Sequence, residues 1–421
     1  MNIDNLVAVL AIAAAVPLAL GALPRVPVPG PVLEIVAGII FGPAVLDLIQ
    51  PDQAVRLLAT IGLGFLLFLA GLEIDIQHFR GAPARLAGMG LVCSMILAAI
   101  IGGVLHAVGI VESSLLVGII LISTSLGLII PILKDAGQLD RPLGQLTIAG
   151  ASLGEVFAVV LLSLFFSERS SGLGAKLLLL VLLALFVSLV VILTLRAEHS
   201  MRLTWLINRL ADTSAQIRIR LSVLLVVGLG AVAMHLGFEA ILGAFIAGAM
   251  LRLVDADADR THPQFHVKLE GLGYGFLIPV FFVTSGLTFN LSVLFSSAST
   301  VLRVPLYLIA ILVVRAVPAL LYRPVLHGRR HVAAAGLLQA ATLPFIVAAT
   351  TIGLQLNAIR PANAAALVAA GLLSVIIFPA IALGLMRRDS IATETAEPES
   401  TPRPLSGELE EALAVDVVSG A

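Results

Sequence analysis

Residues 146–158 read LTIAGASLGEVFA and place a single carboxylate, Glu155, in an otherwise uncharged run. Arg141 lies fourteen residues before it and Glu168 thirteen residues after it. At about 1.5 Å of rise per helical residue, each interval is roughly 20 Å long. A helix of this length and composition predicts a membrane span with Glu155 near the bilayer centre. A charged carboxylate at that depth costs at least about 2.5 kcal/mol, so it requires a partner, a proton or a bound cation.

The composition of the whole chain favours the lipid bilayer as its solvent. Hydrophobic residues make up 59% of the sequence and charged residues 12%, with a mean hydropathy of +1.09. Soluble domains carry about 25% charged residues. The net charge of −1 gives no indication of nucleic-acid binding, and the few aromatic residues and the lack of a basic stripe predict that nucleic acid is not a partner. The single cysteine, Cys93, excludes an internal disulfide, and no nucleophile–base or metal constellation indicates an enzyme.

Thirteen segments of the sequence are long and apolar enough to be membrane spans. They are residues 6–23, 31–49, 54–76, 86–109, 112–133, 142–167, 175–195, 217–235, 237–253, 270–290, 301–322, 331–355 and 362–386. The short joins at 108–112 and 235–239 leave twelve or fourteen spans as alternatives. We therefore predict an all-α integral membrane domain over residues 1–388. Residues 389–421 are rich in Glu, Thr, Ser and Pro and are predicted to form a disordered cytoplasmic tail.

Lysine and arginine are distributed unevenly between the loops on the two sides of the membrane. With thirteen spans and the N-terminus outside, 18 basic residues fall on the cytoplasmic side and 5 on the other. Basic residues concentrate in cytoplasmic loops. The asymmetry predicts an outside N-terminus and a cytoplasmic C-terminus.

Polar residues interrupt two of the predicted spans at corresponding places in two six-span halves. Residues 121–131 read LISTSLGLIIP, and residues 336–344 read GLLQAATLP. Broken helices in the membrane indicate a cavity lined by protein, because exposed backbone in hydrocarbon is costly. Small and polar residues that only aid helix packing are the alternative interpretation. The hydroxyl side chains of the two interruptions are Ser123, Thr124, Ser125 and Thr342.

Three further charged residues lie within or near the spans. Arg315, in the run LVVRAVP at 312–318, keeps its charge when buried. It is predicted to neutralise the carbonyl end of a broken helix or to pair with a carboxylate, and snorkelling to the interface is the third alternative. Glu34 and Glu73 lie near the ends of the second and third spans, where they either line an ion route or occupy the interface.

Several stretches together resemble the monovalent cation:proton antiporter family, which includes bacterial sodium/proton exchangers and potassium-efflux systems. The resemblance covers roughly residues 6–386. The stretches that carry it are PVLEIVAGIIFGP at 31–43, GLGFLLFLAGLEID at 62–75, LGAFIAG at 242–248, the hydroxyl run at 123–125 and the region of Gln339.

The resemblance implies a fold of thirteen helices with inverted repeats, in which a panel domain forms a homodimer and a mobile core domain contains two crossed, broken helices. Residues 112–133 and 331–355 match the crossed pair, and Arg315 falls where the family often has a buried Lys or Arg. Glu155 matches the second position of the family's paired acidic site. The family commonly has two aspartates there, or Asn or Gln followed by Asp, whereas this chain has Gly154 before Glu155.

The sequence therefore predicts electroneutral exchange of Na⁺ or K⁺ for protons across the cell membrane, without a cofactor or a metal other than the transported cation. Glu155 binds either the proton or the cation in this hypothesis. Oxygen atoms of Ser123, Thr124, Ser125 and Thr342 help to replace the water shell of the cation. Arg315 is a supporting charge, and Glu34, Glu73 and Gln339 are candidates for the pathway.

Two alternatives stay open at this point. One is proton-coupled export of an organic solute, because the missing first carboxylate leaves room beside Glu155. The other is a potassium-efflux pathway with channel-like flux, although the predicted tail is too short for a nucleotide-binding regulatory domain.

Overall fold

The computed structural model describes residues 3–22, 29–73, 81–166, 216–254, 263–326 and 328–394, together with eight positions between 174 and 188. Every regular element within these residues is a helix. Ten of the helices are long and apolar enough to cross a membrane, and two shorter apolar helices, Gly30–Phe41 and Ala240–Leu253, accompany them. Each of these twelve segments overlaps one of the predicted spans. The seventh predicted span, 175–195, lies outside the described residues except for scattered positions.

The helices form two groups, which we call the panel and the core. The panel comprises α1 (Ile3–Ala22), α2 (Gly30–Phe41), α3 (Gln53–Leu72), α10 (Ile217–His235), α11 (Ala240–Val254), α13 (Pro263–Leu272), the π-helical turn η2 (Gly273–Leu277) and α14 (Ile278–Leu287). The core comprises α4 (Gly81–Ala107), α5 (Ser114–Ile122), α6 (Leu126–Asp135), α7 (Pro142–Phe165), α16 (Ala298–Ala316), the 3₁₀ turn η3 (Pro318–Tyr322), α17 (Arg329–Gln339), α18 (Pro344–Gln355) and α19 (Pro361–Glu394). A short helix, α15 (Leu291–Leu294), connects the panel to the core.

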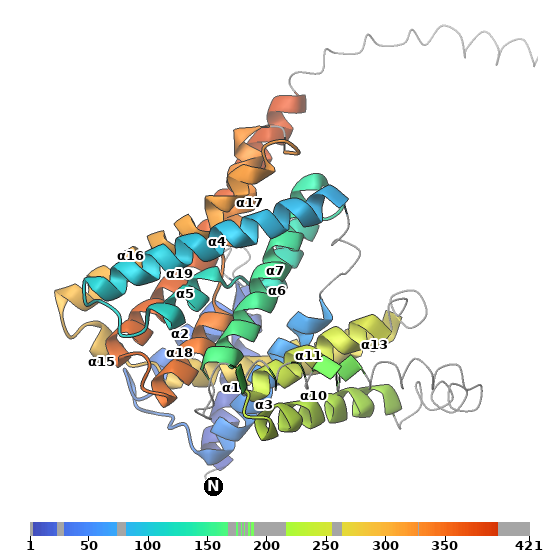
Figure 1. The fold of residues 1–421 in the computed structure, drawn as a ribbon. Coiled ribbons are helices and arrows are strands. Elements are labelled where there is room, and N and C mark those ends of the chain that lie inside the picture. The colour runs from blue at the N-terminus through green and yellow to red at the C-terminus, as the bar shows by residue number, and fades with distance from the viewer. Residues whose placement is uncertain are drawn as a thin grey trace, which may run out of the picture.

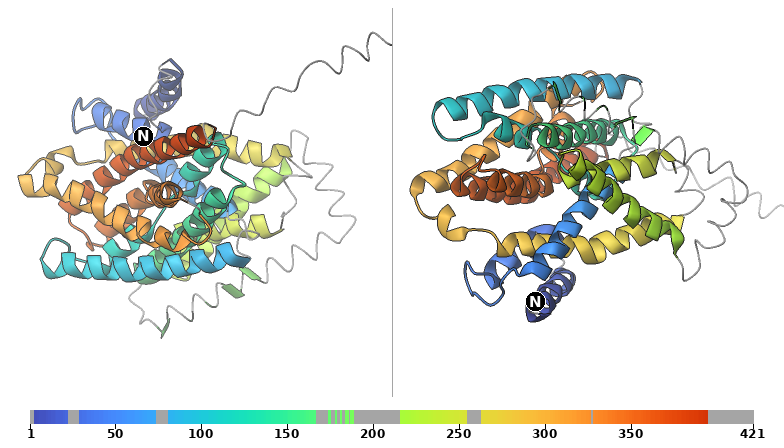
Figure 2. Two further views of the ribbon diagram at one scale, coloured as in Figure 1. Left: turned by 90° about the horizontal axis from the view of Figure 1, so that it is seen from above. Right: turned by 60° about the horizontal axis from the view of Figure 1, so that its bottom comes forward.

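The two groups occupy opposite sides of the molecule. In Figure 1, α4 and α16 lie side by side along one face, far from α1, α3 and α10. Both views in Figure 2 keep α1 and α4 on opposite sides. The panel and the core meet mainly where α3 packs on α6 and where α11 packs on α7.

The packing of the first half of the chain is repeated in the second half. In the panel, α2 packs on α14 and α3 packs on α11, so each pair joins one helix from each half. In the core, α4 packs on α7 just as α16 packs on α19. The paired arrangement is typical of transporters built from inverted repeats.

Glycines allow the panel helices to approach until their backbones touch. A Cβ atom added at Gly38 or Gly286 would lie 2.1 Å from a backbone oxygen of the facing helix, between α2 and α14. Between α3 and α11, the corresponding distances are 2.1 Å at Gly71 and 1.9 Å at Gly248. Small residues are what permit such close contacts between membrane helices.

The two predicted interruptions are breaks between separate helices, and they lie against each other. The chain is extended between α5 and α6, and α18 begins at Pro344, whose missing N–H suits the first turn of a helix. The hydroxyls of Ser123 and Thr342 are 3.0 Å apart. Thr124 Oγ1 donates to the carbonyl of Gln339 at 2.8 Å. The prediction of two crossed, broken helices is confirmed.

Several helix ends differ from the predicted boundaries. α2 ends at Phe41 rather than near residue 49, because Gly42 is extended and Pro43 cannot donate to a continuing helix. α19 continues past Arg388 to Glu394, and residues 395–421 of the predicted tail lie outside the described residues.

Candidate ion-binding site

Glu155 lies on α7 with its carboxylate at the beginning of α6. The side chain is 7% exposed. Its Oε2 atom accepts a hydrogen bond from the backbone N–H of Leu126, the first residue of α6, at 3.2 Å. The N-terminus of a helix carries a partial positive charge, so the break between α5 and α6 supplies a favourable end for a carboxylate. The site therefore depends on the break as well as on the glutamate.

Arg315 fills the space beside Gly154. A Cβ atom added at residue 154 would lie 2.9 Å and 3.0 Å from the two terminal nitrogens of Arg315, and 3.0 Å from the carbonyl oxygen of Ile122. The guanidinium is buried and donates through Nη2 to the carbonyl of Gly150 at 3.0 Å. In the family pattern, the residue before the acidic position carries a side chain. Here that residue is Gly154, and the guanidinium of Arg315 fills the space, so the extra room expected beside Glu155 is absent.

The hydrogen bonds of Arg315 favour one of its three predicted roles. Its Nε atom donates to the carbonyl of Gln339 at 3.4 Å, and Gln339 is the last residue of α17. Its Nη1 atom lies 3.5 Å from the hydroxyl of Ser94 on α4. Within the part of the chain that the structure describes, no carboxylate pairs with it. The guanidinium compensates the negative end of a broken helix, as the dipole interpretation predicts.

The hydroxyl groups at the crossing satisfy backbone and side-chain groups of the two breaks. Ser123 donates to the carbonyl of Ile120 at 2.7 Å, in addition to its contact with Thr342. The backbone N–H of Thr342 donates to Ser374 Oγ at 3.2 Å, and Ser374 on α19 donates back to the carbonyl of Thr342 at 3.0 Å. Ser125 is buried and directly precedes Leu126, the residue whose backbone N–H binds the carboxylate of Glu155.

The side chains of Gln339 and Glu34 have their contacts away from the carboxylate of Glu155. The amide of Gln339 donates to the hydroxyl of Tyr322 at 3.0 Å and is 3.4 Å from the carbonyl of Leu146, about two and a half helical turns before Glu155. It braces the end of α17 against α7 and η3. Glu34 is buried on α2, which packs on α14 and α1 rather than on the broken helices. Glu34 is therefore remote from the crossing, whereas Gln339 contributes its backbone carbonyl to the crossing and directs its amide side chain away from it.

Glu73, by contrast, reaches the beginning of α6. The residue caps the C-terminus of α3, and its Oε1 atom accepts a hydrogen bond from the hydroxyl of Tyr274 at 3.4 Å. A Cβ atom added at Gly127 would lie 3.8 Å and 3.9 Å from the two carboxylate oxygens of Glu73. Gly127 directly follows Leu126, whose N–H binds Glu155.

The sequence-based prediction omitted several residues around the site. Ser94, Tyr322 and Ser374 contact the predicted residues from helices outside the two breaks. Ser152 lies one turn before Glu155 on α7, and its buried hydroxyl has no hydrogen-bond partner among the described residues. A hydroxyl three residues from a buried acid was a visible signal for Ser152, whereas the other three depend on contacts between distant segments.

A sequence model of the family described as "Sodium/hydrogen exchanger, transmembrane" matches residues 9–385. The putative Na⁺/H⁺ antiporter YjbQ of Bacillus subtilis is 29% identical over 403 residues, which cover 92% of this chain and 64% of that protein. The chain thus spans about two thirds of the length of this relative. The Na⁺/H⁺ antiporter of Enterococcus hirae is 28% identical over 64% of this chain and 69% of its own length.

The fold is also similar to that of a solved antiporter. The structure of the sodium proton antiporter MjNhaP1 from Methanocaldococcus jannaschii at pH 8 matches with a TM-score of 0.63. The match covers 92% of this chain and 98% of that one at 19% sequence identity. From the family match over residues 9–385, the chain is a multi-pass membrane protein that belongs to the transmembrane sodium/hydrogen exchanger family.

Proposed function

We propose that this protein exchanges a monovalent cation, Na⁺ or K⁺, for protons across the cell membrane, and that Glu155 carries both ions in turn. The observation that carries the proposal is the buried carboxylate of Glu155 at the N-terminus of α6, on the crossing of two broken helices. The antiporter names of the relatives support the same class of reaction.

One carboxylate can bind a proton or a cation but not both, so the two ions compete. Either loaded form of Glu155 is neutral, which predicts electroneutral one-for-one exchange. The hydroxyl and carbonyl oxygens of the breaks provide hard ligands of the kind that such cations prefer. The positive charge of Arg315 compensates the negative carbonyl end of α17 throughout the cycle, both when Glu155 holds an ion and when it has released it.

Alternating access requires the core to move against the panel. The limited contact between them, through α3 with α6 and α11 with α7, suits such a movement. The glycine-packed panel is the rigid part, and we propose that it forms the homodimer. The distribution of basic residues supports an outside N-terminus and a cytoplasmic C-terminus.

Proton flux from purified protein in liposomes, measured with a pH-sensitive dye, tests the proposal. Adding Na⁺ or K⁺ should release protons from acid-loaded liposomes, and Glu155→Gln should abolish the release. Glu270→Gln is the matched control, because Glu270 is an exposed carboxylate on α13. Full exchange by Glu155→Gln would refute the carrier assignment. No proton movement with Na⁺, K⁺ or Li⁺ would favour export of an organic solute instead.

An imposed membrane potential tests the stoichiometry separately. Electroneutral exchange should proceed at the same rate with a potential of either sign. A rate that follows the imposed voltage would overturn the one-for-one claim and leave the role of Glu155 intact.

A further inference from the structure

A groove of about 560 Å³ lies on α4, beside the 3₁₀ turn η3. It follows α4 from Ala84 to Leu97, and Leu321 of η3 contributes to its wall. At about 1.5 Å of rise per residue, this part of α4 is roughly 20 Å long. One leaflet of a bilayer, with its headgroups, is also roughly 20 Å thick. The groove therefore has the length of one lipid molecule in one leaflet.

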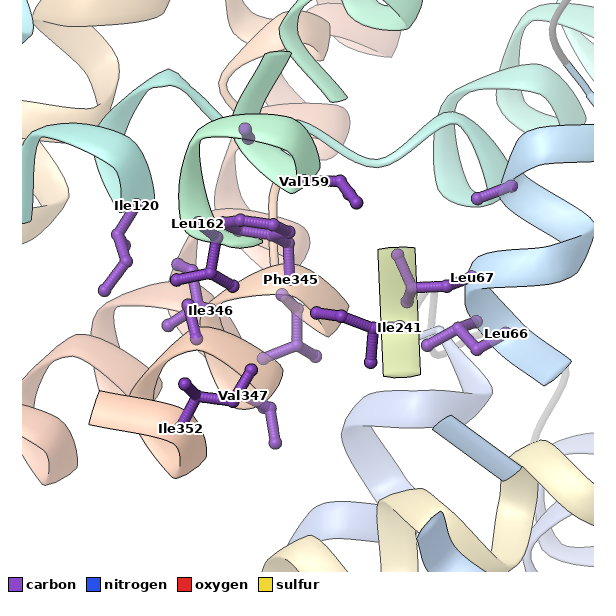
Figure 3. Packing of buried hydrophobic residues seen from close by; sticks show 14 of the residues in the cluster. Leu66, Leu67, Ile120, Val159, Leu162, Ile241, Phe345, Ile346, Val347 and Ile352 are labelled. Atoms are coloured by element: carbon purple, nitrogen blue, oxygen red, sulfur yellow. The ribbon is translucent and has the colours of Figure 1, made fainter. Parts of the chain in front are cut away.

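The side chains along the groove are apolar and only partly covered by protein. Met89, Val92 and Ile96 are 48%, 56% and 56% exposed. Figure 3 shows the contrasting arrangement inside the molecule, where Leu162 of α7 packs with Phe345 of α18 in a buried cluster. A hydrocarbon chain fits the groove, because a hollowed surface gives the chain more dispersion contacts than a flat helix face does.

The hollow in the surface of α4 depends on Gly88, which lines the groove. A Cβ atom added at Gly88 would have no neighbour within 4 Å, whereas one added at Gly90 would lie 3.4 Å from the hydroxyl of Tyr322. The helix therefore packs on η3 through Gly90 and leaves the space at Gly88 open. A side chain at residue 88 would occupy the groove without displacing the described atoms around it.

Positive charge lies at the end of the groove that is cytoplasmic in the orientation we propose. Arg85 lines the groove, and Arg323 follows Leu321 by two residues. Both arginines are exposed, and neither has an ion-pair partner among the described residues. Arginine binds phosphate through two parallel hydrogen bonds. An anionic phosphate headgroup therefore complements this end of the groove.

We propose that the groove binds one anionic phospholipid of the cytoplasmic leaflet, with an acyl chain along α4 and its phosphate at Arg85 and Arg323. The groove belongs to the core, and α4 lies on the side of the molecule opposite α1 (Figure 1). The lipid site is therefore separate from the homodimer contact that we propose for the panel, and it is also separate from the carboxylate of Glu155.

The opposite side of α4 contacts the ion-binding site. Ser94 on α4 donates to the carbonyl of Val314 at 3.0 Å, and its hydroxyl lies 3.5 Å from Nη1 of Arg315. A lipid in the groove thus supports, from the membrane side, the helix that holds Ser94 beside Arg315.

Cys93 reports the occupancy of the groove, because it lines the groove and is the only cysteine of the chain. The experiment measures its alkylation by N-ethylmaleimide in purified protein, by intact-mass spectrometry, at rising concentrations of phosphatidylglycerol in detergent. This anionic lipid should slow the alkylation about tenfold, and zwitterionic phosphatidylcholine should slow it less than about twofold. Arg85→Gln should raise the phosphatidylglycerol concentration for half-protection about fivefold. Arg220→Gln, which changes an exposed arginine on α10 of the panel, is the control and should shift it less than about twofold.

A substitution at Gly88 tests the acyl-chain contact. Gly88→Leu should lower the amount of bound phosphatidylglycerol, counted by native mass spectrometry, about tenfold. Gly103→Leu is the matched control, because Gly103 also lies on α4 and a Cβ there has no neighbour within 4 Å. The control should retain the lipid as the unmodified protein does.

Three results would overturn the proposal. They are equal protection of Cys93 by the two lipids, equal shifts for Arg85→Gln and Arg220→Gln, and undiminished lipid binding by Gly88→Leu. A loss of dimers for Gly88→Leu but not for Gly103→Leu in size-exclusion chromatography would assign the groove to a second copy of the chain instead. If Gly88→Leu is not monodisperse, the Arg85→Gln titration decides, because that change leaves the apolar walls intact. All these measurements record lipid binding, so their outcome does not depend on the proposed exchange.

Discussion

At the crossing of α5–α6 with α17–α18, side chains satisfy the buried backbone, whereas between α3 and α11 the two backbones touch directly. Thr124 and Arg315 share the carbonyl of Gln339 at the crossing. Gly71 and Gly248 leave no room for a side chain in the panel. Close packing of backbones stabilises the panel, whereas hydrogen bonds between polar groups that can change partners stabilise the crossing. Substitutions in the panel should therefore prevent folding, whereas substitutions at the crossing should abolish transport and leave the protein folded.

The largest effect is expected in the panel, for Gly248→Val. Its Cβ would lie 1.9 Å from the carbonyl oxygen of Phe68, and only separation of α3 from α11 relieves that contact. We expect no monodisperse protein in detergent by size-exclusion chromatography. Gly103→Val is the matched control, since a Cβ at Gly103 has no neighbour within 4 Å. A folded Gly248→Val protein would show that the panel is not the rigid part.

At the crossing, Arg315→Met should yield protein that folds but transports poorly. The change leaves the carbonyls of Gly150 and Gln339 without their charged donor. Hydrogen bonds to charged groups contribute about 1.5–3 kcal/mol each, so the melting temperature should fall by several degrees. Exchange should fall at least about tenfold, and Arg315→Lys should restore part of it. A thermal melt and a proton-flux assay measure the two effects, and unchanged values in both would remove Arg315 from the site.

The interpretation of Gly154 can be tested by a double-mutant cycle. Gly154→Asp should displace the guanidinium of Arg315 and slow exchange several-fold, because its Cβ would lie within 3.0 Å of both terminal nitrogens. Arg315→Lys removes the planar group, so the double variant should exchange faster than Gly154→Asp alone. Effects that simply add would show that residues 154 and 315 do not share this space.

The smallest effect is expected for a single hydroxyl. Ser123→Ala removes the bond to Thr342 and should cost about 1 kcal/mol of stability, with a change in apparent KM of about twofold. Ser285→Ala is its counterpart in the panel, because among the described contacts the hydroxyl of Ser285 bonds only the carbonyl of Phe281 on its own helix. The control should leave the KM unchanged. Equal effects on the KM in the two variants would remove the distinction between crossing and panel.

Contacts between distant residues could not be predicted from the pattern. Arg315 donates to the carbonyls of Gly150 and Gln339, which lie 165 and 24 residues away in the chain. These carbonyl partners support the helix-dipole role of Arg315 over an ion pair. Gln339 was a reasonable pathway candidate, yet its amide points to Tyr322 and α7. Glu34 and Glu73 looked equivalent near the ends of two spans, and the packing of α2 and α3 gives them different surroundings.

The sequence by itself determined the membrane class, the positions of twelve of the predicted spans and both breaks, because hydropathy and helix-breaking residues act over one segment at a time. Only the tertiary structure decided that Arg315 occupies the space at Gly154 and that Glu73, rather than Glu34, reaches α6. Both arrangements depend on how closely the glycine-containing helices pack and on which side chains form hydrogen bonds with the ends of the broken helices. Such contacts join residues that are far apart in the chain, and no local pattern records them.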